Sequence, residues 1–425
     1  MSVAAVLEKD YFTDYSILLD PYEYFDAMRA IGPVCEMPAT GALLVTGFKE
    51  AVEVLRNNVD FSSINSTVGA GVPLPFEPNG SDISEQLEQH RDFYVGGDLV
   101  VTFDDGRHRA LRSIANKLFT PSRLKQNQEY IHQLAKTMVQ QAVMQGGCDL
   151  VNDIATPFVT LVIADLLGVP AEDREKFREV IDNAPPPGNL DQSDAPTENS
   201  PLVFMGTYFF QYLMDRKSSP KADVLTELAQ ATYPDGSEAD LLDMVKLATF
   251  MFGAGQDTSA KLLSNAMKYI VDIPGLQAQL RADPKLIGNF LEEVLRLEGS
   301  TKATTRVARK DTQIGERKVS AGTRVLVALA AANRDPMRWP KPNTFILNRP
   351  KIAEHVAFGR GVHTCVGAPL ARTEVRIILE HFLAATREIG LCESNHGSAN
   401  ARKFNYEASF IIRGLSELFI TLAAN

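Results

Sequence analysis

The chain has 425 residues, of which 45% are hydrophobic, so it can bury a large core and exceeds the usual length of one domain. Its formal net charge of -10 argues against a nucleic-acid-binding protein, because such proteins need basic surfaces to neutralise phosphates. The N-terminal segment lacks the basic and apolar regions of a signal peptide, and no stretch reaches about 18 uninterrupted apolar residues. We therefore expect a soluble, cytoplasmic protein with no membrane span and no nucleic-acid partner.

Helical periodicity dominates the sequence, and strand-like runs are short and few, which predicts a mainly α fold with a small β region. In chain order, we expect a helix at 21–32, a strand at 41–47, a helix at 122–143, a long helix from Ser237, a helix at 283–299, strands within 316–330, a helix after Cys365 and a strand at 410–414.

Two long loops stand out by their composition. The first, from Ser66 to Asp82, is rich in Gly and Pro and also contains apolar residues, whereas the second, from Asn183 to Pro201, is polar and rich in Pro. Loops of this length in a compact protein usually carry function. We expect the first to cover a binding site and the second to join two helices.

The long helix from Ser237 is apolar on almost all sides in its middle, which predicts that it crosses the core. At its centre stands GAGQDTS, residues 253–259, where each glycine costs roughly 1 kcal/mol relative to alanine. We expect a local distortion here, with a flat ligand against the glycines and with Asp257 and Thr258 offering a carboxylate and a hydroxyl. Alternatively, the glycines permit close helix packing and the Thr258 hydroxyl bonds to a backbone carbonyl.

FGRGVHTCVG, residues 358–367, places Cys365 at the N-terminus of a predicted helix, where partial positive charge and free N–H groups favour a thiolate. Zinc would require further ligands, and none stands near in the sequence. A cysteine nucleophile would need a base, and His363 would point to the opposite side of an extended loop. Haem iron needs one protein ligand on its proximal side, so a single thiolate in a glycine-rich loop suits haem.

Haem also carries two propionates that need neutralising partners. Basic residues suited to that role lie in three separate stretches: His108 and Arg112 one helical turn apart, Arg306 in TTRVARKD, and His363 in the cysteine loop.

These residues together carry a resemblance to a known family: the chain resembles a soluble bacterial cytochrome P-450, a haem-thiolate monooxygenase. FGRGVHTCVG is similar to the haem-binding loop of that family at Phe358, Gly359, Gly361, His363, Cys365 and Gly367. AGQDTS resembles the oxygen-activation motif, and EVLR resembles the buried Glu-x-x-Arg pair as Glu293 and Arg296. The family usually has an Arg before Phe345 that completes a triad, but Thr344 stands here. Either another residue completes the triad, or this brace is looser.

The resemblance covers nearly the whole chain and implies one cytochrome P-450 domain over residues 1–425, with the long central helix over haem b (iron protoporphyrin IX). It implies Cys365 as the axial iron ligand and Asp257 and Thr258 as the acid and alcohol of oxygen activation. Ala254, Gly255, Phe358, Gly359 and Gly367 would lie against the haem, and His108, Arg112, Arg306 and His363 would hold its propionates.

The resemblance also implies a substrate pocket on the distal side. Helical spacing from Thr258 brings Phe250 and Ala254 to one face, with Leu247 and Met251 beside them, so we expect an apolar pocket and apolar substrates. The segment after the Glu-x-x-Arg helix resembles a pocket-lining strand and would add Thr301, Lys302, Ala303 and Thr304. Lys302 would either bind a substrate carboxylate or point away from the pocket.

The implied reaction is the insertion of one oxygen atom from O2 into a small or medium apolar organic substrate. The chain has no nucleotide-binding GxGxxG fingerprint and no cysteine cluster, so electrons must come from a separate ferredoxin or flavodoxin with an NAD(P)H-dependent reductase. A donor of acidic surface would meet Arg109, Arg112, Arg360 and Arg372. The alternatives are a hydrogen-peroxide-driven peroxygenase of the same fold, a non-catalytic haem sensor, and a protein without haem.

Overall fold

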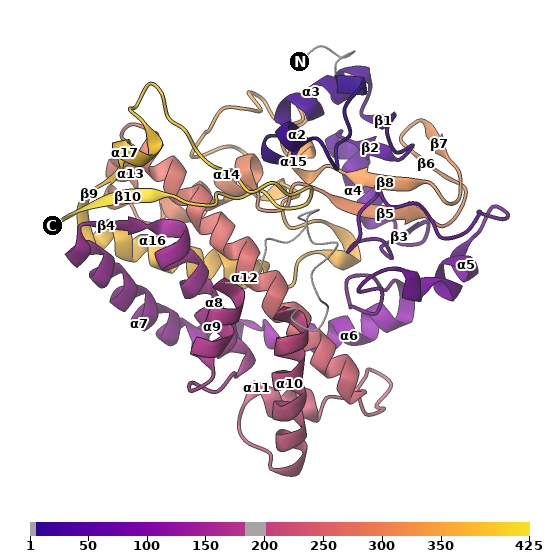
Figure 1. Cartoon of the computed structure of the whole chain (residues 1–425), viewed down its shortest axis with the longest axis horizontal. Coiled ribbons are helices and arrows are strands. Elements are labelled where there is room, and N and C mark those ends of the chain that lie inside the picture. The colour runs from indigo at the N-terminus through magenta and orange to yellow at the C-terminus, as the bar shows by residue number, and fades with distance from the viewer. Residues whose placement is uncertain (1–5, 183–200) are drawn as a thin grey trace.

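A computed structural model describes residues 6–182 and 201–425 of the chain. Helices make up most of it, and three small sheets lie toward its edges, so the predicted mainly α fold with a small β region is confirmed (Figure 1). The helices are α2 (Tyr15–Leu19), α3 (Tyr22–Ile31), α4 (Phe48–Arg56), α5 (Ser84–Gln89), α6 (Asp105–Leu118), α7 (Pro121–Gln145), α8 (Thr156–Leu167), α9 (Arg174–Asp182), α10 (Pro201–Ser218), α11 (Val224–Ala229), α12 (Leu241–Asp272), α13 (Leu276–Ala282), α14 (Leu286–Glu298), α15 (Leu329–Ala332), α16 (Ala368–Ala385) and α17 (Glu393–His396).

The largest sheet has five strands in the order β1-β2-β8-β5-β3, and only the β2–β8 pair is parallel. A second sheet has the order β4-β10-β9, and β6 pairs with β7. The strands are β1 (Val34–Glu36), β2 (Leu43–Val45), β3 (Phe61–Ser62), β4 (Gly147–Asp149), β5 (Thr304–Ala308), β6 (Thr312–Ile314), β7 (Arg317–Val319), β8 (Arg324–Val327), β9 (Thr386–Leu391) and β10 (Phe419–Ala424).

Helix α12 crosses the whole molecule and packs against α8, α10, α14 and α16 (Figure 1). It begins at Leu241 rather than near Ser237, because the Asp240 carboxylate caps it by accepting from the N–H groups of Leu242 and Asp243 at 2.8 and 3.2 Å. The helix is α-helical without interruption through GAGQDTS, so the expected local distortion is absent.

Three further sequence predictions need correction or fall outside the described residues. The strand expected at 410–414 is not formed: Ile412 makes one isolated bridge with Thr301, and the last strand is β10. Apolar residues of the Ser66–Asp82 loop pack beside a satellite cluster around Ile64, and none lines the central cavity described below. Residues 183–200 of the second loop lie outside the described part of the chain.

One described stretch, Leu150–Leu167, is long and apolar enough to cross a membrane, but 72% of it is buried inside the molecule. Burial of this kind is typical of a core helix, and α8 packs against α7 and α12.

The Glu-x-x-Arg pair on α14 does have a third partner. The Glu293 carboxylate accepts from Arg296 at 2.8 and 2.9 Å and from Nε of Arg349 at 3.0 Å, and the Glu293 and Arg296 side chains have no exposed area. Arg349 also donates to the carbonyl oxygen of Thr344 at 2.7 Å. The triad is therefore completed by Arg349, five residues after Thr344, so of the two alternatives that the sequence left open, another residue as third partner is correct.

Arg349→Met should lower the free energy of unfolding by about 3 to 5 kcal/mol, because it breaks a buried ion network on one side. Thr344→Val is the matched control: it keeps the backbone carbonyl that Arg349 uses, and the Thr344 side chain is exposed, so a change within about 0.5 kcal/mol is expected. Urea unfolding measures both. Equal, small effects in the two variants would contradict the assignment of Arg349 as the third partner.

Candidate functional site

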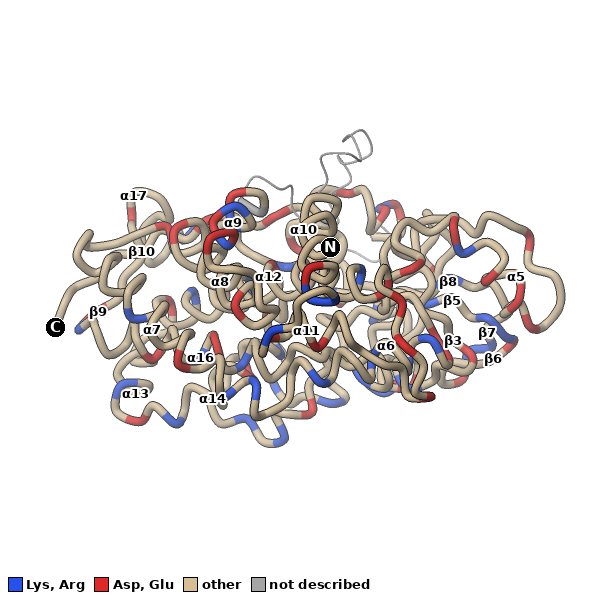
Figure 2. Tube along the Cα trace, turned by 90° about the horizontal axis from the view of Figure 1, so that it is seen from below, with Lys and Arg blue, Asp and Glu red and all other residues tan. Residues whose placement is uncertain are grey.

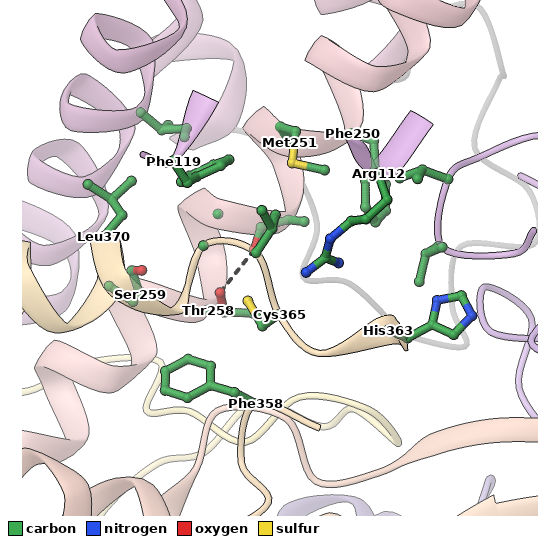
Figure 3. A pocket seen from close by; sticks show the side chains of 18 of the residues that line it. Arg112, Phe119, Phe250, Met251, Thr258, Ser259, Phe358, His363, Cys365 and Leu370 are labelled. Atoms are coloured by element: carbon green, nitrogen blue, oxygen red, sulfur yellow. Dashed lines mark hydrogen bonds between the residues drawn. The ribbon is translucent and has the colours of Figure 1, made fainter. Parts of the chain in front are cut away.

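The candidate active site is a largely apolar cavity between α12 and the cysteine loop (Figure 3). Figure 3 shows Arg112 and His363 to one side of the Cys365 sulfur and Phe119 and Leu370 to the other, while Thr258 belongs to α12 on the opposite wall. Residues from four separate regions of the sequence, α6, α8, α12 and the segment from Phe358 into α16, thus meet in one place.

The local backbone explains how the loop presents its cysteine. Gly359 and Gly361 have φ of +68° and +77°, and a side chain at 361 would lie 2.3 Å from the carbonyl oxygen of Leu55. The Cys365 N–H donates to the Phe358 carbonyl at 2.9 Å, which closes the loop two residues before the N-cap of α16.

The sulfur of Cys365 is accessible from the cavity, whereas protein surrounds it on the other sides. Burial raises the pKa of the Cys365 thiol, and the N–H groups of Gly367 and Ala368 and the charge of Arg112 offset only part of this rise. The N–H groups at the start of α16 do favour the thiolate, as the sequence predicted, but desolvation has the larger effect on the pKa of Cys365. A bound metal ion would reverse this balance, because a coordinating thiol is deprotonated.

Helix α12 forms the opposite wall with Phe250, Met251, Ala254, Gly255 and Thr258, all of which line the cavity as predicted. The Thr258 hydroxyl donates to the Ala254 carbonyl at 2.9 Å, which is the alternative that the sequence left open. This bond still leaves the hydroxyl oxygen free to accept from a neighbour. Burial raises the pKa of Asp257, and the nearby Lys261 ammonium lowers it in part.

The four basic residues predicted to act together do lie together. The rings of His108 and His363 have centroids 4.2 Å apart, and Arg112 donates to the Thr364 carbonyl in the cysteine loop. Burial and neighbouring positive charges lower the pKa of both histidines, that of His363 to about 2, so both rings are neutral at neutral pH. Only the two arginines therefore contribute positive charge here.

Arg306 on β5 is 5% exposed, and its guanidinium donates to the Thr305 carbonyl and the Thr304 hydroxyl at 2.6 and 3.2 Å. Among the described residues no carboxylate lies within 4.0 Å of it, and burial lowers its pKa to about 10. A buried guanidinium with only neutral partners is costly unless an anion approaches it.

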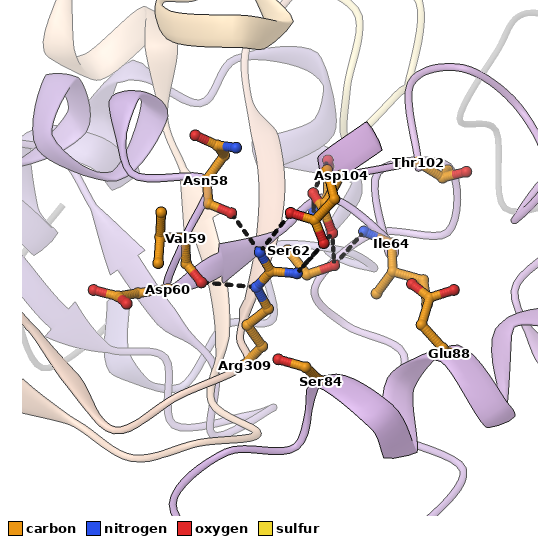
Figure 4. A network of polar contacts seen from close by, with 12 residues as sticks. Asn58, Val59, Asp60, Ser62, Ile64, Ser84, Glu88, Thr102, Asp104 and Arg309 are labelled. Carbon is orange, nitrogen blue, oxygen red and sulfur yellow. Dashed lines mark hydrogen bonds and ion pairs between the residues drawn. The ribbon is translucent and has the colours of Figure 1, made fainter. Parts of the chain in front are cut away.

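A polar network fixes the beginning of α6, which carries His108 and Arg112 (Figure 4). Arg309 donates to the carbonyl oxygens of Asn58 and Val59, both at 2.8 Å, and to the Asp105 carboxylate at 3.2 Å. The neighbouring Asp104 carboxylate accepts from the Ser63 hydroxyl at 2.9 Å, and that hydroxyl lies 2.8 Å from Nε2 of His363. The network therefore positions both α6 and the His363 ring.

Several predicted pocket residues do not line the cavity. Leu247 is buried within the core, and Thr301, Lys302 and Ala303 also lie away from the cavity walls. Lys302 has no exposed area, and its ammonium donates to the carbonyl oxygens of Leu18 and Ser409. It joins the N-terminal and C-terminal segments, so of the two orientations considered from the sequence, the one away from the pocket is correct.

Other lining residues were missed by the sequence analysis, namely Val100, Val101, Phe119, Val159, Ile163, Ser259, Val366, Leu370, Ala371 and Glu374. Most are apolar and carry no distinguishing signal. Glu374 could have been found as the one acid in the first three turns of an otherwise apolar helix face, four residues after Leu370. It is buried, and burial raises its pKa to about 8.

The residues present fit a haem. A flat, mostly apolar ring suits the slot between Ala254 and Gly255 on one side and the cysteine loop on the other. The accessible thiol matches a single axial ligand, and the uncompensated Arg306 guanidinium matches a carboxylate at the ring edge.

Comparisons with known proteins agree with this reading of the site. Residues 209–386 match the family model described as Cytochrome P450. Cytochrome P450 109 of Bacillus spizizenii is 32% identical over 372 residues, which are 86% of this chain and 84% of the relative.

Two solved structures extend the likeness to the fold. Substrate-free CYP150A6 of Mycobacterium marinum is 44% identical, with a TM-score of 0.92 and 99% of both chains covered. CYP109E1 from Bacillus megaterium in complex with testosterone is 25% identical, with a TM-score of 0.77, covering 95% of this chain and 99% of the other. Because the likeness in sequence and in fold extends over nearly the entire chain, this protein belongs to the cytochrome P450 family of monooxygenases.

Proposed function

We propose that this protein hydroxylates a small or medium apolar organic substrate, using O2 and electrons from a separate ferredoxin or flavodoxin with an NAD(P)H-dependent reductase. The observation that carries the proposal is the accessible Cys365 sulfur, which faces an apolar cavity whose opposite wall holds Thr258. We also propose that the chain forms one cytochrome P-450 domain and acts in the cytoplasm.

Haem b would be held by Cys365 as the axial ligand and by a set of donors at the ring edge. The guanidinium groups of Arg112 and Arg306 would offset the charges of two propionates, while the neutral His108 and His363 rings would donate N–H groups. When bound, haem supplies an iron that activates O2, and a thiolate ligand favours cleavage of the O–O bond.

The lining of the cavity supports an apolar substrate. Phe250, Met251, Val101 and Ile163 offer hydrocarbon and thioether surface, and no charged side chain lines the α12 wall. CYP109E1, one of the similar structures, was solved with testosterone, which is an apolar molecule of medium size. Screening steroids and fatty acids for the low-spin to high-spin shift of the haem band would identify a substrate.

Asp257 and Thr258 would deliver protons during oxygen activation. Thr258 would orient a hydrogen bond toward the cavity, and Asp257 would act as a general acid, since burial raises its pKa toward neutrality. This acid and alcohol pair favours O2 as the oxidant over hydrogen peroxide, because a peroxygenase receives its oxygen already reduced and protonated. A haem sensor without turnover would have no use for the pair.

The electron donor would dock beside the cysteine loop. Acidic and basic residues are interspersed along the whole trace in place of one extended basic face (Figure 2). Arg109 is exposed next to His108, and Arg360 is half-buried within the loop, whereas Arg372 is engaged with Glu292 at 2.6 and 2.9 Å and Arg112 with Thr364. We therefore propose Arg109 and Arg360 as the residues of this surface that meet an acidic donor.

Cys365→His tests the proposed iron ligand. Haem uptake should persist, but the reduced carbon monoxide complex should lose the red-shifted band of a thiolate ligand, and NADH-driven product formation should vanish. Absorption spectra of the purified variant check the first outcome. A red-shifted band that survives the substitution would reject Cys365 as the ligand.

Arg306→Ala should weaken haem retention by about 1.5 to 3 kcal/mol, because a buried propionate loses a charge-assisted hydrogen bond. Transfer of haem to apomyoglobin measures the loss rate. Arg109→Ala is the matched control, since it removes an exposed arginine of the proposed donor surface and should leave haem transfer unchanged. Transfer rates that agree between the two variants would argue against Arg306 as a propionate partner.

Thr258→Ala and Asp257→Asn should differ in their effects on turnover. Thr258→Ala should keep consuming NADH while product falls and hydrogen peroxide rises, whereas Asp257→Asn should slow NADH consumption by about 10²-fold or more, as expected for loss of a general acid. Product and peroxide per NADH are measured on equal amounts of haem-loaded protein with the substrate selected by the spectral screen. Unchanged coupling in Thr258→Ala would defeat its role in proton delivery.

A further inference from the structure

A cluster of three ionisable side chains, which includes the proposed proton donor Asp257, lies outside the cavity lining. Asp257 and Lys261 are one helical turn apart on α12, with Oδ1 and Nζ 3.8 Å apart. The Lys261 ammonium also makes an ion pair with the Glu407 carboxylate, which comes from the C-terminal segment that passes over α12 (yellow in Figure 1). The side chains of Asp257, Lys261 and Glu407 are 16%, 5% and 13% exposed.

The fold is shaped to bring Lys261 to this position. A side chain at Gly414 would lie 2.1 Å from Cδ of Lys261, so the lysine stem passes directly over a glycine. The segment folds back on itself there, because the Glu407 N–H donates to the Gly414 carbonyl at 3.0 Å. Nζ of Lys261 also lies 3.4 Å from the Leu415 carbonyl oxygen. Residues on both sides of this turn, Glu407 and Leu415, therefore hold the ammonium of Lys261 near the Asp257 carboxyl.

When both carboxyls are ionised, the cluster carries a net charge of −1, and one added proton would make it neutral. One ammonium offsets one carboxylate, and the second would remain as an uncompensated charge in a site of low exposure. Oδ2 of Asp257 and Oε2 of Glu407 are buried and have no hydrogen-bond partner among the described residues. Burial raises the pKa of both carboxyls, and the Asp257 charge raises that of Glu407 further. One shared proton relieves these costs together.

We propose that Glu407 is the second acid of a proton relay, which refills Asp257 from the C-terminal side of α12, and that Lys261 positions both carboxyls for the transfer. The relay rests on the proposed role of Asp257 as the general acid. Asp257 gives its proton to the oxygen acceptor beside Thr258, which leaves both carboxyls ionised. Glu407 then takes a proton from solvent and passes it to Asp257 through a water molecule. Each carboxyl ends in its starting state, and one proton has moved from solvent to the acceptor.

The first test measures the shared proton without turnover. Infrared difference spectra of the resting holoenzyme, parent minus variant, should show the C=O stretch of one protonated carboxyl lost in both Glu407→Gln and Asp257→Asn, because the remaining carboxyl pairs with Lys261 and ionises. Lys261→Met should increase the same absorption, since neither carboxyl then has a cation. The band of the buried Glu374 cancels in these differences. No change in any of the three variants would overturn the proposal.

The second test is a double-mutant cycle on NADH consumption with the substrate selected by the spectral screen. Glu407→Gln should slow consumption by about tenfold, and should add little to Asp257→Asn, because residues acting in series are not additive. Glu417→Gln is the matched control: it changes a carboxyl of the same segment that accepts from Asn405 at 2.8 Å, and it should keep the parent rate.

The outcomes separate the relay from the function on which it depends. A parent rate in Glu407→Gln beside a slow Asp257→Asn would overturn the relay and leave the role of Asp257 intact. A parent rate in Asp257→Asn would overturn both. Additive losses in the double variant, together with reduced haem loading, would show that Glu407 only stabilises the C-terminal segment.

Discussion

Burial of the Glu293 carboxylate is the constraint from which the architecture around the cysteine loop follows. A fully buried carboxylate must be satisfied by cations and N–H groups, and here Arg296, Arg349 and the Ile346 N–H all donate to it at 2.8 to 3.0 Å. The guanidinium groups of Arg296 and Arg349 donate their other N–H groups to backbone carbonyls between Asn333 and Thr344. Asn333 in turn accepts from the Val356 N–H at 2.7 Å, two residues before Phe358. One buried charge on α14 therefore fixes the backbone of the segment that leads to the cysteine loop.

Two buried arginines near the cavity, Arg306 and Arg309, differ in whether a carboxylate neutralises them. At the start of α6, Arg309 is neutralised by Asp104 and Asp105, and the network closes on itself. Arg306, which is more deeply buried, receives only neutral partners among the described residues. Two arginines within one sheet region thus differ in whether the protein itself supplies the anion. An arginine with its own carboxylate partners serves the structure, whereas one without them is suited to bind an anionic ligand. The sequence around either residue does not show this difference.

Helix α12 has three structural roles along its length. Its apolar sides fill the core, its small residues Ala254 and Gly255 leave room at the cavity, and its Asp257 and Lys261 bring charge to a place that only the C-terminal segment can satisfy. The helix is regular through this stretch, and the Thr258 hydroxyl bonds to the Ala254 carbonyl within it. Room for a ligand therefore comes from side-chain size, and not from a break in the helix.

The sequence by itself determined the fold class, the long central helix and the cysteine loop, because hydrophobic periodicity and glycine spacing are local signals. It also singled out His108, Arg112 and His363, which meet at the cavity, and Arg306, which is buried beside them. Only the tertiary structure decided that Arg349 completes the triad, that Lys302 joins the two ends of the chain, and that the Cys365 sulfur opens onto an apolar cavity. Each of these depends on which distant segments pack together, since burial and ion pairing across 40 or more residues leave no trace in local sequence pattern.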